Sequence, residues 1–288
     1  MTQTINTNLA SLNAQRNLSV SQSQLGTAMQ RLSSGMRVNS AKDDAAGLAI
    51  AERMNSQVRG MTVAIRNAND GISMSQVAEG ALGNVSTLFQ RMRELAVQSA
   101  NGTNSDSDRV SLNQEFSQLA QEATRTLGGT QFNGQNILST TSDSVFQIGA
   151  NSSSDVDRLT VSAFSWATNT NITGVLGTAV ISGTDAPSVQ ITDTATAQAA
   201  IASMDVAIDA INAQRANYGA VQNRFDNIVS GMQVAVENQS AARSRIMDAD
   251  YAAETSALSR ANILQQAGNA MVAQANQLPQ QVLSLLKG

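Results

Sequence analysis

Proline is nearly absent from this chain of 288 residues, and this constrains its fold more than any other feature. It occurs only at Pro187 and Pro279, so residues 1–186 contain no residue that interrupts a helix by lacking a backbone N–H group. Apolar residues recur at spacings of three and four through most of that stretch, and again towards the other end of the chain. The sequence therefore predicts several very long helices.

The middle of the chain has a different pattern from its two ends. We expect helices at about 3–33, 41–100, 107–127, 195–247 and 250–286. Between 130 and 195, the segments "TQFNGQNIL", "SVFQIGA" and "RLTVSAF" alternate polar with apolar or β-branched residues, which predicts short strands and hairpins. The segments "NSSSD" and "TNTNITG" indicate exposed loops. The expected fold is mainly α with a small β part, in which the two helical ends of the chain can meet.

The stretch "RLSSGMRVNSAKDDAAGLAIAERM", residues 31–54, breaks this helical pattern near one end of the chain. Gly35 fits a left-handed cap at the end of the first helix. Ser40 fits the N-cap of the next helix, with Asp43 three residues later, and Asp44 adds negative charge to its first turn. We therefore predict a helix end, a short joint and a helix start, with uncharged polar residues such as Asn39 inside the joint.

The terminal helices carry more apolar residues than one partner can cover. Ile5, Leu9 and Leu12 share one face of the first helix. A second face holds Leu18, Leu25, Met29 and Leu32. At 100° per residue the two stripes lie roughly 200° apart, so this helix should contact different neighbours. The last helix has a regular 4-3 seam, whose period predicts a left-handed supercoil: Ala257, Ala261, Leu264, Gly268, Met271, Ala275, Leu278, Val282 and Leu285.

The composition excludes several kinds of chemistry. Cysteine and histidine are both absent, which rules out a disulfide framework, a thiolate nucleophile, a Ser-His-Asp triad and an imidazole metal site. A net charge of −4 gives no basic face for nucleic acid. No phosphate-binding loop or G-x-S-x-G elbow is present, and the adjacent Asp43 and Asp44 are poorly placed to share a metal. We predict no catalytic, cofactor or metal site and no enzyme activity.

The amino terminus, "MTQTINTNLASL", lacks the basic and apolar regions of a signal peptide. No apolar run approaches the roughly 18 residues of a membrane span. These features predict a cytoplasmic protein, or one exported by a route that uses no such signal, and no membrane insertion.

Both ends of the chain resemble those of the bacterial flagellins. "INTNLASLNAQRNLSVSQSQLGTAMQRLSSGMRVNSAKDDAAGLAIAERM" (5–54), "RNANDGISMSQVAEGAL" (66–82) and "QRMRELAVQSANGTNS" (90–105) resemble the amino-terminal region of that family. "SAARSRIMDADYAAETSALSRANILQQAGNAMVAQANQLPQQVLSLL" (240–286) resembles its carboxyl-terminal region. The resemblance covers about 1–150 and 195–288, in the order and at the ends that the family requires.

The resemblance implies a layered fold, a long antiparallel helical bundle or coiled coil. Residues 1–40 with 250–288 would form the inner coiled coil, called D0. Residues 41–155 with 195–249 would form the next layer, D1, a helical rod with a β-hairpin. Only 156–194 would remain as a short variable outer segment, too small for full outer domains.

The resemblance also implies a function and partners. Flagellins polymerise into the extracellular filament that a rotary motor turns for swimming. Their subunits leave the cell unfolded through the flagellar type III export system, without a cleaved signal peptide. The implied partners are other copies of the chain, an export chaperone, the cap and hook-junction proteins, and a vertebrate Toll-like receptor that recognises flagellins from several groups.

Four groups of residues follow from the resemblance. The D0 polymerisation seam would contain Ile5, Leu9, Leu12, Leu264, Met271, Leu278, Val282 and Leu285. The joint between D0 and D1 would contain Gly35, Asn39, Ser40, Asp43 and Asp44. The D1 surface for filament contacts and receptor recognition would contain Gln90, Arg91, Glu94, Leu95, Gln98 and Glu115. The segment bound by the export chaperone and by a sensor inside host cells would contain Val282, Leu283, Leu285 and Leu286.

Three alternatives remain at this point. A hook–filament junction protein would share the terminal architecture, but the match through 41–105 favours flagellin. A chemoreceptor-like signalling coiled coil should carry membrane spans and longer unbroken heptads. A flagellin with an enzyme inserted in its middle would need more than this short segment, which lacks His and Cys.

Overall fold

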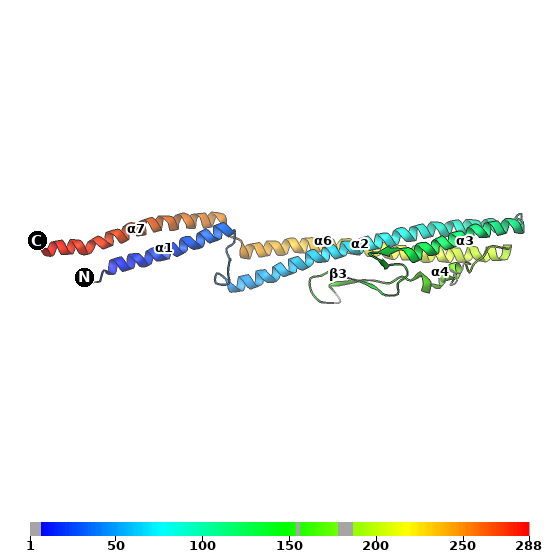
Figure 1. Cartoon of the computed structure of the whole chain (residues 1–288), viewed down its shortest axis with the longest axis horizontal. Coiled ribbons are helices and arrows are strands. Elements are labelled where there is room, and N and C mark those ends of the chain that lie inside the picture. Colours follow the sequence, from blue (N-terminus) through cyan, green and yellow to red (C-terminus); the bar gives the residue numbers. More distant parts are fainter. Residues whose placement is uncertain (1–6, 154–155, 178–186, 288) are drawn as a thin grey trace. The chain divides into compact units, whose positions relative to one another are not determined.

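The computed structural model describes residues 7–153, 156–177 and 187–287, apart from the side chains of 278–287. Its helices are α1 (Leu9–Ser34), α2 (Ala45–Ser99), α3 (Asp106–Gly129), η1 (Trp166–Thr168), α4 (Thr170–Leu176), α6 (Thr194–Met247) and α7 (Tyr251–Lys287) (Figure 1). Its strands are β1 (Gln131–Phe132), β2 (Gln135–Asn136), β3 (Ser144–Gln147) and β4 (Arg158–Val161). The predicted fold class, mainly α with a small β part, is confirmed.

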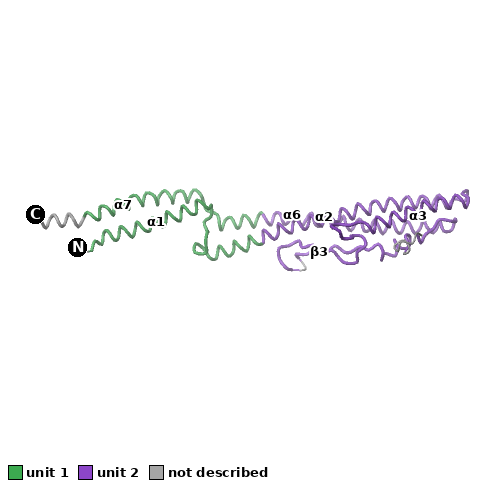
Figure 2. The backbone as a smooth tube through the Cα atoms, in the orientation of Figure 1, with its two compact units in different colours: residues 1–56, 237–288 green, residues 57–236 purple. Residues whose placement is uncertain are grey.

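The chain divides into two compact units (Figure 2). Unit 1 comprises Met1–Ser56 and Glu237–Gly288, and unit 2 comprises Gln57–Val236. Both boundaries fall inside the continuous helices α2 and α6. The division into D0, D1 and an outer segment stays a prediction.

In unit 1, α1 and α7 pack side by side and run antiparallel. Two contacts show the orientation: Asn8 contacts Ala275, and Arg31 lies 3.9 Å from Glu254. The contact face of α1 is a 3-4 seam of buried or half-buried residues: Ser11, Ala14, Leu18, Ser21, Leu25, Ala28 and Leu32. On α7 the corresponding residues are Glu254, Ala257, Ala261, Gln265, Gly268, Val272 and Ala275.

Only part of the 4-3 stripe of α7 faces α1. Ala261 and Ala275 are buried, whereas Leu264 and Met271 are exposed, and the half-buried Gln265 and Val272 continue the face towards α1. The face of α7 towards α1 therefore contains Gln265 and Val272 in place of Leu264 and Met271. The larger apolar residues lie on the flank of the pair.

Unit 2 is built around one hydrophobic core. The largest fully buried side chains of α2, α3 and α6 include Leu82, Phe89, Met92, Phe116, Leu127, Met204 and Phe225. The rings of Phe146 and Phe225 meet edge to face, with centroids 5.4 Å apart. Phe225 also lies against Gly71, where an added Cβ would be 2.5 Å from its ring. This glycine is needed because α2 and the ring approach each other so closely.

The two strand pairs lie where alternation predicted them. β1 and β2 pair antiparallel through a tight turn at Asn133 and Gly134, whose φ angles are 50° and 77°. This sequence and these angles are typical of two-residue hairpin turns. β3 pairs antiparallel with β4, from Ser144 opposite Val161 to Gln147 opposite Arg158.

The segment "TNTNITG" was predicted as an exposed loop, and that prediction is wrong. Its residues begin helix α4, which Asn169 caps by accepting a hydrogen bond from the Asn171 N–H group. Ile172, Val175 and Leu176 are fully buried in the core of unit 2. Tertiary burial of these three side chains outweighs the low helix propensity of the Asn and Thr residues around them.

Candidate functional site

The joint after α1 begins with the predicted glycine cap. Gly35 has a φ of 71°, in the left-handed region that glycine adopts without steric cost. Beyond it, the two connecting segments of unit 1 pair with each other. Met36 and Asp248 form an antiparallel bridge, the Ala249 N–H donates to the Gly35 carbonyl at 2.9 Å, and the Arg37 N–H donates to the Met247 carbonyl at 2.6 Å.

Arg37 also caps helix α6 from the other end of the chain. Its Nη2 donates to the Ile246 carbonyl at 2.7 Å, where the last carbonyls of α6 have no partner within the helix. A positive charge is favourable at this helix end. A small apolar cluster of Val38, Ala51 and Met247 lies beneath the connection. The sequence reasoning did not identify Arg37, because its partners are about two hundred residues away.

Ser40 does not cap α2, so that prediction is wrong. The helix begins at Ala45, and the Asp44 carboxylate accepts from the Gly47 N–H at 2.8 Å. Ser40 and Asp43 instead close a turn before the helix, in which one Asp43 oxygen accepts from the N–H groups of Asn39 and Ser40 and from the Ser40 hydroxyl. These joint residues therefore use much of their hydrogen-bonding capacity within the chain.

This turn predicts a specific response to acid. Hydrogen bonds from Ser40 and then Asn39 hold the pKa of the Asp43 carboxyl below its usual 3.8. A carboxyl whose pKa is lowered on folding stabilises the fold above its unfolded pKa, and that stabilisation is lost as the pH falls through the folded value. The stability gap between the native chain and Asp43→Ala should be constant from about pH 7 to 5 and shrink below about pH 4. Thermal unfolding at each pH measures it, and a gap unchanged in strong acid would contradict the assignment.

The predicted seam residues that the structure describes lie in contact with solvent. The exposed fractions are 71% for Leu9, 50% for Leu12, 45% for Leu264 and 61% for Met271. Ile5 and the side chains of Leu278, Val282, Leu283, Leu285 and Leu286 lie outside the described residues. An additional exposed apolar residue on α7, Ile263, was not predicted. The role of all these residues as contacts stays a prediction.

The predicted surface on α2 and α3 is centred on Arg91. Its guanidinium donates to Glu94 at 3.0 Å and to Glu115 at 2.9 and 3.1 Å, and these two carboxylates raise the pKa of Arg91. Gln90 and Gln98 are exposed beside it. The prediction that Leu95 belongs to this surface is wrong, because its side chain is only 1% exposed and lies in the core of unit 2.

Phe89 and Met92, which lie beside and within this stretch of α2, are fully buried as well. The helical spacing of Leu82, Val85, Phe89, Met92 and Leu95 already contained this signal. The surface that remains is polar, and whether Gln90, Arg91, Glu94, Gln98 and Glu115 contact a partner stays a prediction.

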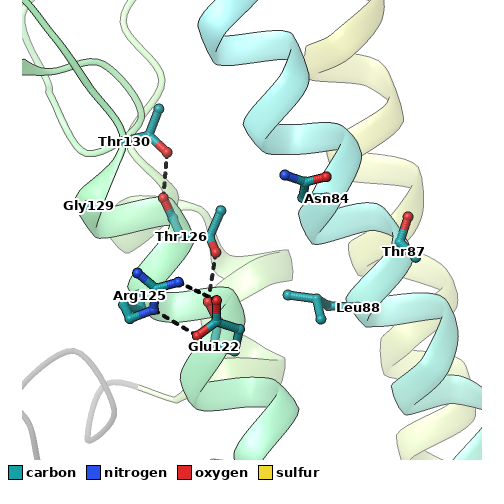
Figure 3. Close-up of a pocket in the computed structure, with 8 residues that line it drawn as sticks. All are labelled: Asn84, Thr87, Leu88, Glu122, Arg125, Thr126, Gly129 and Thr130. Carbon is teal, nitrogen blue, oxygen red and sulfur yellow. Dashed lines mark hydrogen bonds and ion pairs between the residues drawn. The ribbon is translucent and has the colours of Figure 1, made fainter.

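A groove of about 560 Å³ lies between α2 and α3, and the sequence reasoning missed it (Figure 3). Its lining residues are Asn84, Thr87, Leu88, Glu122, Arg125, Thr126, Gly129 and Thr130. Glu122 and Arg125 pair along α3, which lowers the pKa of Glu122. The hydroxyls of Thr87 and Thr126 donate to backbone carbonyls of their own helices. This groove brings together no nucleophile and base.

The described residues contain neither a candidate metal cluster nor a candidate membrane span. Among them, no group of three or more His, Cys, Asp or Glu side chains is arranged to hold a metal ion. No described helix combines the length and the apolar character that crossing a membrane requires.

Comparison with known proteins gives consistent matches along the chain. The family described as the bacterial flagellin N-terminal helical region matches residues 5–143, and the bacterial flagellin C-terminal helical region matches residues 201–286. A flagellin of Halalkalibacterium halodurans is 46% identical over 98% of this chain and 99% of its own length. The flagellar filament 33 kDa core protein of Treponema phagedenis is 43% identical, with the same coverage of both chains.

A solved structure shares the fold. The flagellar hook-associated protein of Vibrio parahaemolyticus superposes with a TM-score of 0.58 at 15% identity, over 72% of this chain and all of that one. At this identity the likeness concerns the fold alone, so it does not favour a hook-associated role. The sequence matches show that this chain is a structural subunit of the flagellar filament and not an enzyme. The filament is an extracellular assembly. The chain belongs to the bacterial flagellin family.

Proposed function

We propose that this filament subunit polymerises through α1 and α7 of unit 1. The observation that supports the proposal is the exposure of large apolar side chains on α1 and α7. These side chains lie on the faces of the two helices that do not contact the other helix. Leu9, Leu12, Val20, Ile263, Leu264 and Met271 are each at least 45% exposed, although α1 and α7 cover each other's seam. Each leucine buried against another subunit would contribute roughly 1.5–3 kcal/mol.

The small-residue seam suits a subunit that gains order on assembly. The buried residues of the α1–α7 contact include Ser11, Ser21, Ala28, Ala261 and Ala275, so the pair alone buries little apolar surface. Isolated helices of this length are marginal in water without tertiary packing. Other subunits supply that packing, which couples the folding of unit 1 to polymerisation.

Electron microscopy of the purified chain tests this proposal. The full chain is expected to form long filaments, and a chain lacking residues 1–35 and 255–288 is expected to stay monomeric. The truncated chain should keep the circular dichroism and cooperative unfolding of unit 2, which serves as its control. A full chain that stays monomeric even when seeded or salted out would instead support a junction or cap-associated role.

Export as an unfolded chain through the flagellar type III system fits the same features. The sequence contains no cysteine, so no disulfide has to be broken before the chain unfolds. The thin seams of unit 1 lower the cost of unfolding. The proposed partners on this route are an export chaperone that binds Val282, Leu283, Leu285 and Leu286, followed by the hook-junction and cap proteins at the filament.

Recognition by a vertebrate Toll-like receptor is proposed for the polar surface around Arg91. The Arg91 guanidinium is half-exposed and held in place by Glu94 and Glu115, so the surface presents one positive and two negative charges in a fixed arrangement. Arg91→Ala should lower receptor signalling without loss of fold, because exposed ion pairs contribute only about 0–1 kcal/mol. Arg125→Ala, on the same helix pair, is the control. Signalling unchanged by Arg91→Ala would count against this role.

A further inference from the structure

A pocket of about 410 Å³ in unit 2 belongs to none of the surfaces described above. It is lined by the β1–β2 hairpin, the loop that follows this hairpin, the first three residues of β3 and one residue of α2. Its volume lies within the range of small-molecule sites in proteins. The groups that line it therefore indicate which class of molecule it would hold.

Apolar side chains form one part of the lining. Met74 and Ile137 are each 7% exposed, and Phe132 and Phe146 are half-buried. Phe146 also meets the Phe225 ring edge to face, with centroids 5.4 Å apart, so its own ring is held in place. The pocket thus offers partly exposed aromatic rings beside buried apolar residues.

Three side-chain amides form much of the polar lining. Asn133, Gln135 and Asn136 are exposed, and within the described part of the chain their side chains make no hydrogen bond. Each amide can donate and accept at the same time. The tight turn at Asn133 and Gly134, with φ angles of 50° and 77°, holds the three amides on one short hairpin.

Asp143 supplies a carboxylate whose position is fixed. One of its oxygens accepts from the Ala163 N–H group at 2.8 Å, which leaves the other oxygen available as an acceptor. Among the described residues that line the pocket, none is a lysine or an arginine. An anionic ligand would therefore face this carboxylate without a compensating positive charge, whereas a ligand with neutral hydroxyl groups would not.

We propose that this pocket binds a neutral saccharide unit. A sugar ring carries hydroxyl groups, which donate and accept as the amides and Asp143 require. Its faces carry C–H groups, which suit the negative face of an aromatic ring such as Phe132. Such a site would allow the subunit to attach to surfaces that carry neutral glycans. The site lies wholly within unit 2, so it is separate from polymerisation through α1 and α7 and is tested independently of it.

Saturation-transfer NMR of the soluble full chain tests the proposal with the methyl glycosides of glucose, galactose, mannose and N-acetylglucosamine. Ligands of this size bind weakly, so we expect at least one of the four to bind with a Kd of about 1 mM. The C–H protons on one face of that sugar should receive the strongest saturation, because they would contact the rings. Glucuronic and galacturonic acid should bind at least about tenfold more weakly than that sugar, because their carboxylates would face Asp143.

Gln135→Ala/Asn136→Ala removes two of the amides from exposed positions and leaves the backbone pairing of the hairpin in place. Two lost hydrogen bonds, each contributing about a factor of five, should raise the Kd by about 25-fold. Gln131→Ala/Asn151→Ala changes the same residue types at exposed positions outside the pocket and should leave the Kd unchanged. Asn133→Gly removes the third amide, at a φ angle that glycine adopts freely, and should raise the Kd about fivefold. Circular dichroism should be unchanged in all three variants.

Three results would overturn the proposal. The first is an absence of binding by all four glycosides at concentrations well above the expected Kd. The second is binding that Gln135→Ala/Asn136→Ala and Asn133→Gly leave unaltered, or that the control variant weakens equally. The third is binding of the uronic acids that is as tight as that of the neutral sugars. A chain that binds the sugar but never forms filaments would leave this site standing and would overturn the proposed polymerisation instead.

Discussion

Replacing Phe225 with alanine is expected to lower the free energy of unfolding by about 3–5 kcal/mol. Phe225 is fully buried on α6, meets the Phe146 ring edge to face, and fills the space beside Gly71. The substitution removes the apolar contacts of the ring and leaves a cavity that three separate elements line. Urea unfolding followed by circular dichroism measures the loss.

Matched variants separate this cavity from a general effect on α6. Val234→Ala, at a residue of the same helix that is 56% exposed, should change stability by less than about 0.5 kcal/mol. Gly71→Ala alone should also destabilise, because its Cβ would clash with the ring. Combined with Phe225→Ala, the new methyl group would occupy part of the cavity, so the two losses should not add. Simple additivity would show that the two sites are not in contact.

Replacing Arg109 with alanine is expected to lower the free energy of unfolding by about 3 kcal/mol. The loss comes from hydrogen bonds that are no longer made and not from a cavity. Arg109 is 5% exposed, and its guanidinium donates to the carbonyls of Ser99, Asn101 and Asn104. Ser99 is the last residue of α2, so this side chain caps the helix and fixes the turn that follows. Without it, partly buried carbonyls at a helix end lose their donor.

Two substitutions test this reading of Arg109. Arg109→Lys should recover only part of the loss, because a lysine keeps the charge but cannot serve three carbonyls with a planar fork. Arg125→Ala removes an arginine that is exposed and paired within α3, and should cost about 0.5 kcal/mol or less. Equal losses for Arg109→Ala and Arg125→Ala in urea unfolding would contradict a capping role.

The long helices could be predicted because their signal is local and repeated. The absence of proline before residue 187, together with spacings of three and four, predicted α2 to within a few residues of its observed ends, Ala45 and Ser99. Helix α4 was missed because its own residues favour a loop. Its helix depends on Ile172, Val175 and Leu176 reaching a core that other segments build.

In the candidate site too, features set by the local sequence could be predicted and features set by distant contacts could not. Gly35 could be identified because a left-handed cap is a property of one residue and its helix. Arg37 could not, because its role depends on the carbonyls of α6. The resemblance to the family motif assigned every residue of the segment to a surface, including Leu95. The spacing of Leu95 from Phe89 and Met92 instead predicts the buried position that it has.

The pairing of Arg37 with Ile246 has a consequence for the order in which the chain folds. These residues are 209 positions apart, and the contact of Asn8 with Ala275 spans 267. Contacts between distant segments form late, because the whole intervening chain must first be brought together. If the chain is delivered from one end, the core of unit 2 can form while the trailing helix is still on its way. The cap of α6 and the joint then close only when residues 246–249 have arrived, so completion of the joint follows delivery of all of unit 2 and leaves α7 to pair with α1 last.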